Sequence, residues 1–136
     1  VLNQSGSILQ VVQNYFNSQF STSSATSVST GVNASITPST TSSKILVFAT
    51  IGAAYVAAGS QGSFYLYRGG SQVGGTLAQF YGNASAVESN NSFVFLDTPA
   101  STSSTTYTIY YAASLGTIYG SLNNIQSSII LMEVSA

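Results

Sequence analysis

The chain has 136 residues, of which 44% are apolar and only 4% are charged. It contains no His and no Cys, which excludes a Ser-His-Asp or Cys-His nucleophile, an imidazole or thiolate zinc site and a disulfide framework. Its two basic residues cannot neutralise a run of phosphates, so nucleic-acid binding is excluded too. The composition favours a scaffold or a binding protein, and we expect no enzymatic activity, no cofactor and no metal.

The polar residues are almost all uncharged. Ser, Thr, Asn and Gln make up 57 of the 136 residues, and the formal net charge is −1. Nine Tyr and seven Phe supply enough apolar area for a core, so disorder is not expected. The length fits one domain, which we expect to span residues 1–136. A net charge near zero removes repulsion between copies and favours self-association.

Apolar and polar residues alternate with a period of two along most of the chain, which indicates strands. The first predicted strand, residues 7–17, is followed by a Ser/Thr-rich loop at 18–30 with a short edge strand near Val28. The next strand, residues 32–37, ends at Pro38, since proline has no backbone donor. Residues 44–54 are apolar on both faces, which predicts a strand in the centre of a sheet.

Glycine and polar runs divide the second half of the chain. The pair Gly69-Gly70 predicts a hairpin turn, and residues 57–62 and 82–91 are predicted polar loops. Residues 92–97 are apolar on both faces and are expected to be buried on both. The remaining strands are predicted over 63–68, 76–81, 105–113 and 127–134; residues 71–73 complete the hairpin, and 116–120 are a candidate for a further short strand. Eight or nine such strands predict an all-β antiparallel sandwich, jelly-roll-like in its connections.

The ionisable groups are too few and too scattered to indicate chemistry. The carboxylates are Glu88, Asp97 and Glu133. A glycosidase pair of Glu88 and Asp97 is conceivable, but a solvent-exposed role for Glu88 and a turn-capping role for Asp97 before Pro99 are favoured. The three carboxylates also lack the spacing of a calcium loop. Lys44 is interpreted as a charge at a strand edge rather than as part of a Ser-Lys dyad.

The tyrosines suit both sugar stacking and subunit interfaces, and packing on the strands is the favoured role. The exposed end of the domain is predicted at loops 57–62 and 82–91. The candidate contacts with a receptor or glycan at this end are Tyr81, Asn83, Asn90 and Asn91.

Several phrases of the sequence carry a family resemblance. They are GSILQVVQ at residues 6–13, ITPS at 36–39, SSKILV at 42–47, FYLYRGG at 64–70 and SIILMEV at 128–134. Together they resemble small virion proteins and tail-fibre heads of tailed bacteriophages. The resemblance implies a trimeric β-sandwich, similar in shape to tumour-necrosis-factor and C1q-like heads, on the virion surface and outside the cell. It brings no catalytic residue, and residues 1–6 are interpreted as the end of an upstream attachment segment.

Three functions follow as hypotheses. The first is a non-enzymatic bacteriophage virion protein, a trimeric head that acts as a tail-fibre tip or capsid decoration and binds a host-surface glycan through many weak contacts. Its partners are further copies of itself and other virion proteins, with no nucleic acid and no membrane insertion. The second is a self-assembling filament or coat subunit without a receptor. The third is a secreted lectin-like module that binds carbohydrate as a monomer.

Overall fold

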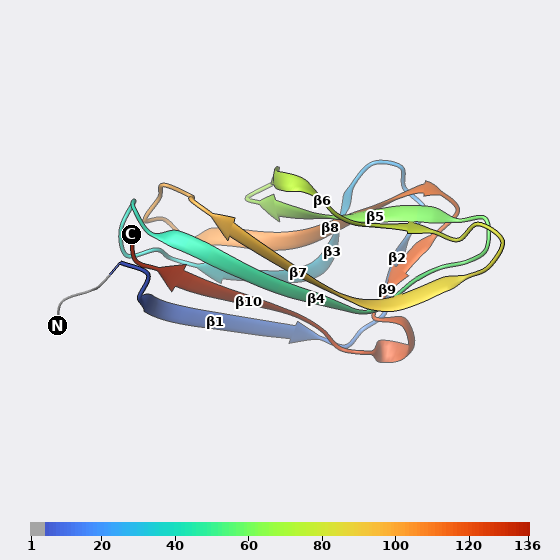
Figure 1. The fold of residues 1–136 in the computed structure, drawn as a ribbon, viewed down its shortest axis with the longest axis horizontal. Coiled ribbons are helices and arrows are strands. Elements are labelled where there is room, and N and C mark those ends of the chain that lie inside the picture. The colour runs from blue at the N-terminus through green and yellow to red at the C-terminus, as the bar shows by residue number, and fades with distance from the viewer. Residues whose placement is uncertain (1–4) are drawn as a thin grey trace.

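The chain folds into two stacked antiparallel sheets (Figure 1). The computed structural model describes residues 5–136, which contain ten strands and one short 3-10 helix, Leu122–Asn124. The strands are β1 (Ile8–Phe16), β2 (Phe20–Thr22), β3 (Val28–Ile36), β4 (Lys44–Val56), β5 (Gln61–Arg68), β6 (Ser71–Tyr81), β7 (Val87–Asp97), β8 (Thr105–Leu115), β9 (Ile118–Gly120) and β10 (Ser127–Val134).

The order of the strands defines a jelly roll. Sheet A contains β1-β10-β4-β7, with β9 pairing the last residues of β4 and β2 pairing β9. Sheet B has the order β3-β8-β5-β6. Along the chain the long strands pass repeatedly from one sheet to the other, and every pairing is antiparallel. The predicted fold class is confirmed: the described residues contain eight long strands and two short strands of three residues each.

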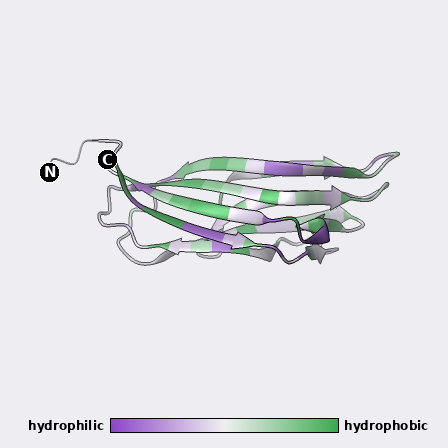
Figure 2. Cartoon of the chain, turned by 90° about the horizontal axis from the view of Figure 1, so that it is seen from below, coloured by the Kyte–Doolittle hydropathy of each residue, from purple (hydrophilic) through white to green (hydrophobic). Residues whose placement is uncertain are grey.

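The core lies between the sheets and explains the period of two. Each long strand turns alternate residues inward, and Figure 2 shows the resulting hydrophobic bands along the strands. The largest fully buried apolar or aromatic side chains are Tyr107, Phe64, Ile36, Ile45, Ile51, Leu66, Ile109, Ile118, Ile129 and Leu131. As predicted, β4 lies in the interior of its sheet, with β10 on one side and β7 on the other.

The hairpin predicted at Gly69-Gly70 is confirmed. Arg68 pairs with Ser71, and both glycines have positive φ, 54° and 91°, as a two-residue turn of this kind requires.

Several predicted strand ends are shifted by one or two residues, and three predicted segments differ more than that. The stretch 18–30 contains β2, which was not predicted, and the edge strand predicted near Val28 is the start of β3 rather than a separate strand. Residues 71–73 and 76–81 belong to one strand, β6, whose pairing with β5 shifts register on either side of Tyr65. Residues 87–91 are not loop but the first half of β7, because the 13-residue strand β4 extends far enough to pair with them.

A glycine in β6 marks a close approach between the sheets. Gly74 has φ +71°, and a Cβ on it would lie 2.6 Å from Cε2 of Phe95, a β7 residue of the opposite sheet. We expect Gly74→Ala to lower the free energy of unfolding by about 1–3 kcal/mol through overpacking and backbone strain. The matched control is Gly75→Ala, where a Cβ would meet open space. Urea denaturation checks this prediction, and equal midpoints for the two variants would contradict it.

Candidate interaction surfaces

The part of the chain that the structure describes contains no cavity and no cluster of three metal-ligating carboxylates. Its single helix is far too short to cross a bilayer. Glu88 and Asp97 both lie on β7, nine positions apart, and an extended strand of that length spans about 30 Å. Two glycosidase carboxylates need a separation of about 5–9.5 Å, so these two cannot form such a pair.

Glu133, on β10, is a buried carboxylate that the sequence analysis left without a role. It is 1% exposed, and Oε1 accepts hydrogen bonds from the backbone N and the Oγ of Ser39 at 2.7 and 2.6 Å. Oε2 accepts a bond from Nε2 of Gln10 at 2.6 Å. Burial acts to raise the pKa of Glu133, but hydrogen bonds from Ser39, Ser43 and Gln10 outweigh it and lower the pKa from 4.5 to about 2. The carboxylate therefore ties β1 and the loop before β4 to β10.

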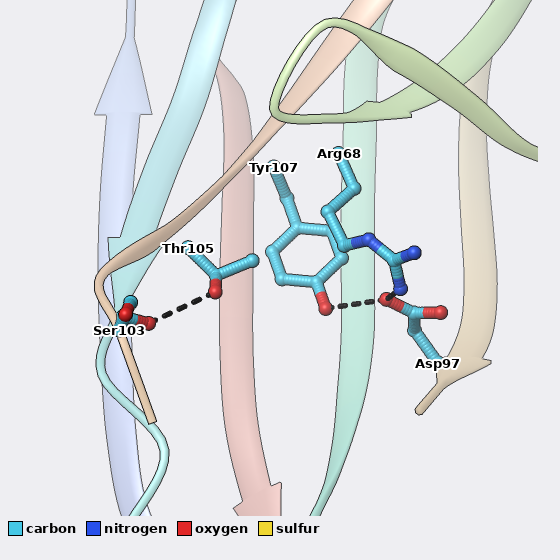
Figure 3. Close-up of polar contacts among 5 residues, drawn as sticks. All are labelled: Arg68, Asp97, Ser103, Thr105 and Tyr107. Atoms are coloured by element: carbon cyan, nitrogen blue, oxygen red, sulfur yellow. Dashed lines mark hydrogen bonds and ion pairs between the residues drawn. The ribbon is translucent and has the colours of Figure 1, made fainter. Parts of the chain in front are cut away.

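A second polar cluster joins the two sheets (Figure 3). Oδ2 of Asp97, on β7 of sheet A, accepts a bond from Nη1 of Arg68 at 2.7 Å and from the Tyr107 hydroxyl at 2.6 Å. Arg68 and Tyr107 belong to β5 and β8 of sheet B. The hydrogen bond to Asp97 raises the pKa of Arg68, and burial together with the bond to Asp97 raises the pKa of Tyr107. The predicted turn-capping role of Asp97 is wrong, since its carboxylate reaches across the sandwich.

The four predicted receptor contacts lie at one end of the sandwich but differ in their surroundings. Tyr81 is exposed at the end of β6, and Asn83 is exposed in the loop that follows. Asn90 lies in β7, where its Oδ1 accepts a bond from the backbone N of Ala53 at 2.8 Å. Asn91 donates to the backbone and side chain of Ser89.

The two predicted loops do meet at this end. The backbone N of Gly82 donates to the oxygen of Ser60 at 2.8 Å, which joins the loop after β4 to the loop after β6. Like Asn90 and Asn91, Tyr81 has a side-chain hydrogen bond, since its hydroxyl donates to Oε1 of Gln79 at 3.1 Å, whereas the side chain of Asn83 forms none within the described residues. Receptor contact by any of the four stays a prediction.

The most distinctive surface is the outer face of sheet A. Residues 92–97 were predicted to be buried on both faces, and this is wrong: Val94 is 58% and Leu96 is 51% exposed. The register aligns them with residues of three other strands, all of them apolar except Gln13. One row across β1, β10, β4 and β7 is Val11, Met132, Leu46 and Leu96, and the next is Gln13, Ile130, Phe48 and Val94.

We call these two rows, together with Ile8 and Val134 beside them, the apolar face. Lys44 pairs with Val134 and is the charged side chain that borders the face. A third row, Tyr15, Ser128, Thr50 and Ser92, closes the face with mostly polar residues. A contiguous exposed apolar patch bounded in this way is typical of an interaction site.

The outer face of sheet B has a different chemistry. One row across β3, β8, β5 and β6 is Ser29, Tyr110, Tyr65 and Thr76, and the next is Asn33, Thr108, Tyr67 and Gln72. The rings of Tyr67 and Tyr110 stack, with centroids 3.9 Å apart and planes 15° from parallel. Aromatic residues therefore occupy the two middle strands, and short polar residues flank them.

The fold is shared with a viral protein of known structure. The crystal structure of the infectious bursal disease virus VP2 subviral particle matches with a TM-score of 0.53 and 14% identity over 93% of this chain. The structure of the Gx strain of the same virus matches with a TM-score of 0.52 and 14% identity over 92%. This chain covers about a third of the length of those two chains, 33% and 32%. The likeness establishes the fold.

A third structure is more distant. A protein of the disulfide-linked pili called Bacillus endospore appendages aligns with all of this chain and 97% of its own, at 15% identity and a TM-score of 0.42. A score of this size does not establish a common fold. No protein-family model and no curated protein matches the chain. The bacteriophage resemblance of the sequence therefore remains a prediction.

Proposed function

We propose that the chain is a non-enzymatic structural protein that self-associates through the apolar face of sheet A. The single observation that supports this most strongly is the alignment of Val11, Met132, Leu46 and Leu96 in one row across four strands. Scattered exposed apolar residues are ordinary on soluble proteins, but a continuous row with a second row beside it is not.

A second copy of the chain is the occupant that fits this face. Together with the third row, the apolar face spans four strands about 4.8 Å apart and about seven residues along each, which presents about 450 Å². Two such surfaces together bury about 900 Å², which is the size of a weak or transient interface. The two rows contain no charged residue, so they offer no ion pair to a charged partner. The apolar face of a second copy of the chain is therefore complementary to this face.

The finer proposal follows the bacteriophage resemblance of the sequence phrases. In it the assembly is a trimer on the virion surface, outside the cell, where it serves as a tail-fibre tip or a capsid decoration held by other virion proteins. The loops after β4 and β6 then face the host surface and bind glycan. The jelly-roll fold is compatible with this role, and the low charge of the chain favours close packing of copies.

The test is the mass of the chain in solution across a range of concentrations. We expect a closed particle whose mass is a small multiple of 14.0 kDa, measured by light scattering with negative-stain microscopy. Val94→Lys places a charge in the apolar face, and we expect it to weaken association by about 100-fold or more, because a buried unpaired charge costs several kcal/mol.

The matched control is Thr76→Lys, an exposed residue on the outer face of sheet B. It should leave the mass unchanged, and circular dichroism should show the same strand content for both variants. A wild-type chain that stays monomeric at every concentration would overturn the proposal. Growth into open fibres would support self-association but would contradict assembly into a closed particle.

A further inference from the structure

We propose that the outer face of sheet B binds neutral carbohydrate, with Tyr65, Tyr67 and Tyr110 as the stacking surface, which we call the tyrosine platform. This site is different from the four loop residues predicted from the sequence. It is also on the opposite side of the sandwich from the apolar face, so an assembly built through sheet A leaves it open.

The platform is rigid and central. Tyr65 and Tyr110 are directly paired across β5 and β8, the two inner strands of sheet B, and Tyr67 is stacked on Tyr110. All three side chains are half-buried on the outward side of the sheet. Because strands paired on both sides hold the rings, little conformational entropy is lost when a ligand binds them.

The chemistry of the platform fits a sugar better than a protein. The faces of aromatic rings attract the C–H groups of a pyranose by dispersion and by the ring quadrupole. Tyr67 and Tyr110 cover one face of each other, so a sugar would stack on their opposite faces and on Tyr65. None of the three tyrosine hydroxyls forms a hydrogen bond within the described residues, so each is available to a sugar hydroxyl. The flanking residues Asn33 and Gln72 lie at the same level of the sheet; the nitrogens of their side-chain amides donate to Gly31 and Gly74, and their side-chain oxygens are left to accept from a sugar hydroxyl. This mixture of rings, hydroxyls and amides contrasts with the rows on sheet A, where most of the side chains are aliphatic.

The charge distribution selects a neutral ligand. The two outward rows of sheet B contain no Asp, Glu, Lys or Arg, and the guanidinium of Arg68 is paired with Asp97. An acidic glycan would therefore gain no ion pair here. β-linked hexose chains expose flat C–H faces and carry no charge, so they are the class that we assign to the platform.

The experiment is a titration of the full chain with cellotetraose and with lactose, followed by NMR of the labelled tyrosine rings. We expect saturable shifts at Tyr65, Tyr67 and Tyr110, and no comparable shift at Tyr15 on sheet A. Tyr67→Ala should weaken binding about tenfold, because one stacked ring is lost. Tetragalacturonate, an acidic sugar chain, should bind more weakly than cellotetraose.

The controls make each outcome decisive. Tyr15→Ala should bind as the wild type does, and Tyr110→Ala repeats the test if Tyr67→Ala fails to fold. The absence of shifts with both neutral sugars would overturn the assignment, as would shifts at Tyr81 alone or equal binding of tetragalacturonate. Light scattering on Tyr67→Ala separates this proposal from self-association. The mass of the oligomer should equal that of the wild type. Loss of the oligomer would mean that the tyrosine platform is an interface between copies of the chain.

Discussion

Replacing Asp97 with Ala should lower the free energy of unfolding by about 2–4 kcal/mol. The Asp97 carboxylate is the acceptor for both the Arg68 guanidinium and the Tyr107 hydroxyl. Tyr107 is fully buried, so without Asp97 its hydroxyl loses its hydrogen-bond acceptor in the core. Because Asp97 belongs to sheet A and both partners belong to sheet B, the loss also weakens the contact between the sheets.

Urea denaturation followed by circular dichroism measures this change. Tyr107→Phe is the graded comparison, since it removes one hydrogen bond and keeps the ring, and we expect a loss of about 1 kcal/mol. Tyr111→Phe is the matched control: Tyr111 is also buried, but its hydroxyl forms no hydrogen bond in the described residues. An Asp97→Ala variant as stable as Tyr111→Phe would contradict the role given to this cluster.

Acidification should remove about 3 kcal/mol of stability through Glu133. Its pKa is lowered to about 2 in the folded chain from 4.5 in the unfolded chain. For a lowered pKa the stabilisation is fully present above the unfolded value and is lost as the pH falls from 4.5 towards 2. Ser39 and Gln10 donate to the ionised carboxylate, and protonation weakens these bonds.

Glu133→Gln tests the origin of this pH dependence. Glutamine cannot ionise and offers one acceptor oxygen instead of two, so the variant should be less stable at neutral pH by about 2–4 kcal/mol. Its stability should also change less than that of the wild type between pH 5 and pH 2, as followed by urea denaturation at each pH. Parallel pH profiles for the two proteins would show that another group is responsible.

The sequence predicted the fold well because the signals for it are local. Alternation with a period of two located the long strands, and Gly69-Gly70 located a turn that only residues with positive φ can form readily. The boundaries near Val87 were wrong because pairing with the long strand β4 overrides the polar character of residues 87–91. The β-propensity of a segment is read from its own sequence alone. The length of a strand within a sheet also depends on the strand that pairs with it.

The surfaces could not be predicted in the same way. Val94 and Leu96 alternate with Phe93 and Phe95, so residues 92–97 have the pattern of a strand buried on both faces. Only the arrangement of the two sheets shows that the face of β7 that carries Val94 and Leu96 is not covered by another layer. The role of Glu133 depends on Gln10 and Ser39, which are distant in sequence, and no spacing rule connects them. The pairing of Tyr65 with Tyr110 is equally a product of the topology.

The most direct test of the central claim is the accessibility of the apolar face in solution. The chain has no cysteine, so Leu96→Cys introduces a single thiol into this face, and Thr76→Cys introduces one on the outer face of sheet B. We predict that the rate of thiol labelling at position 96 falls as the protein concentration rises, while the rate at position 76 stays constant. Labelling rates at position 96 that do not change with concentration, in a chain that remains folded, would contradict self-association through sheet A.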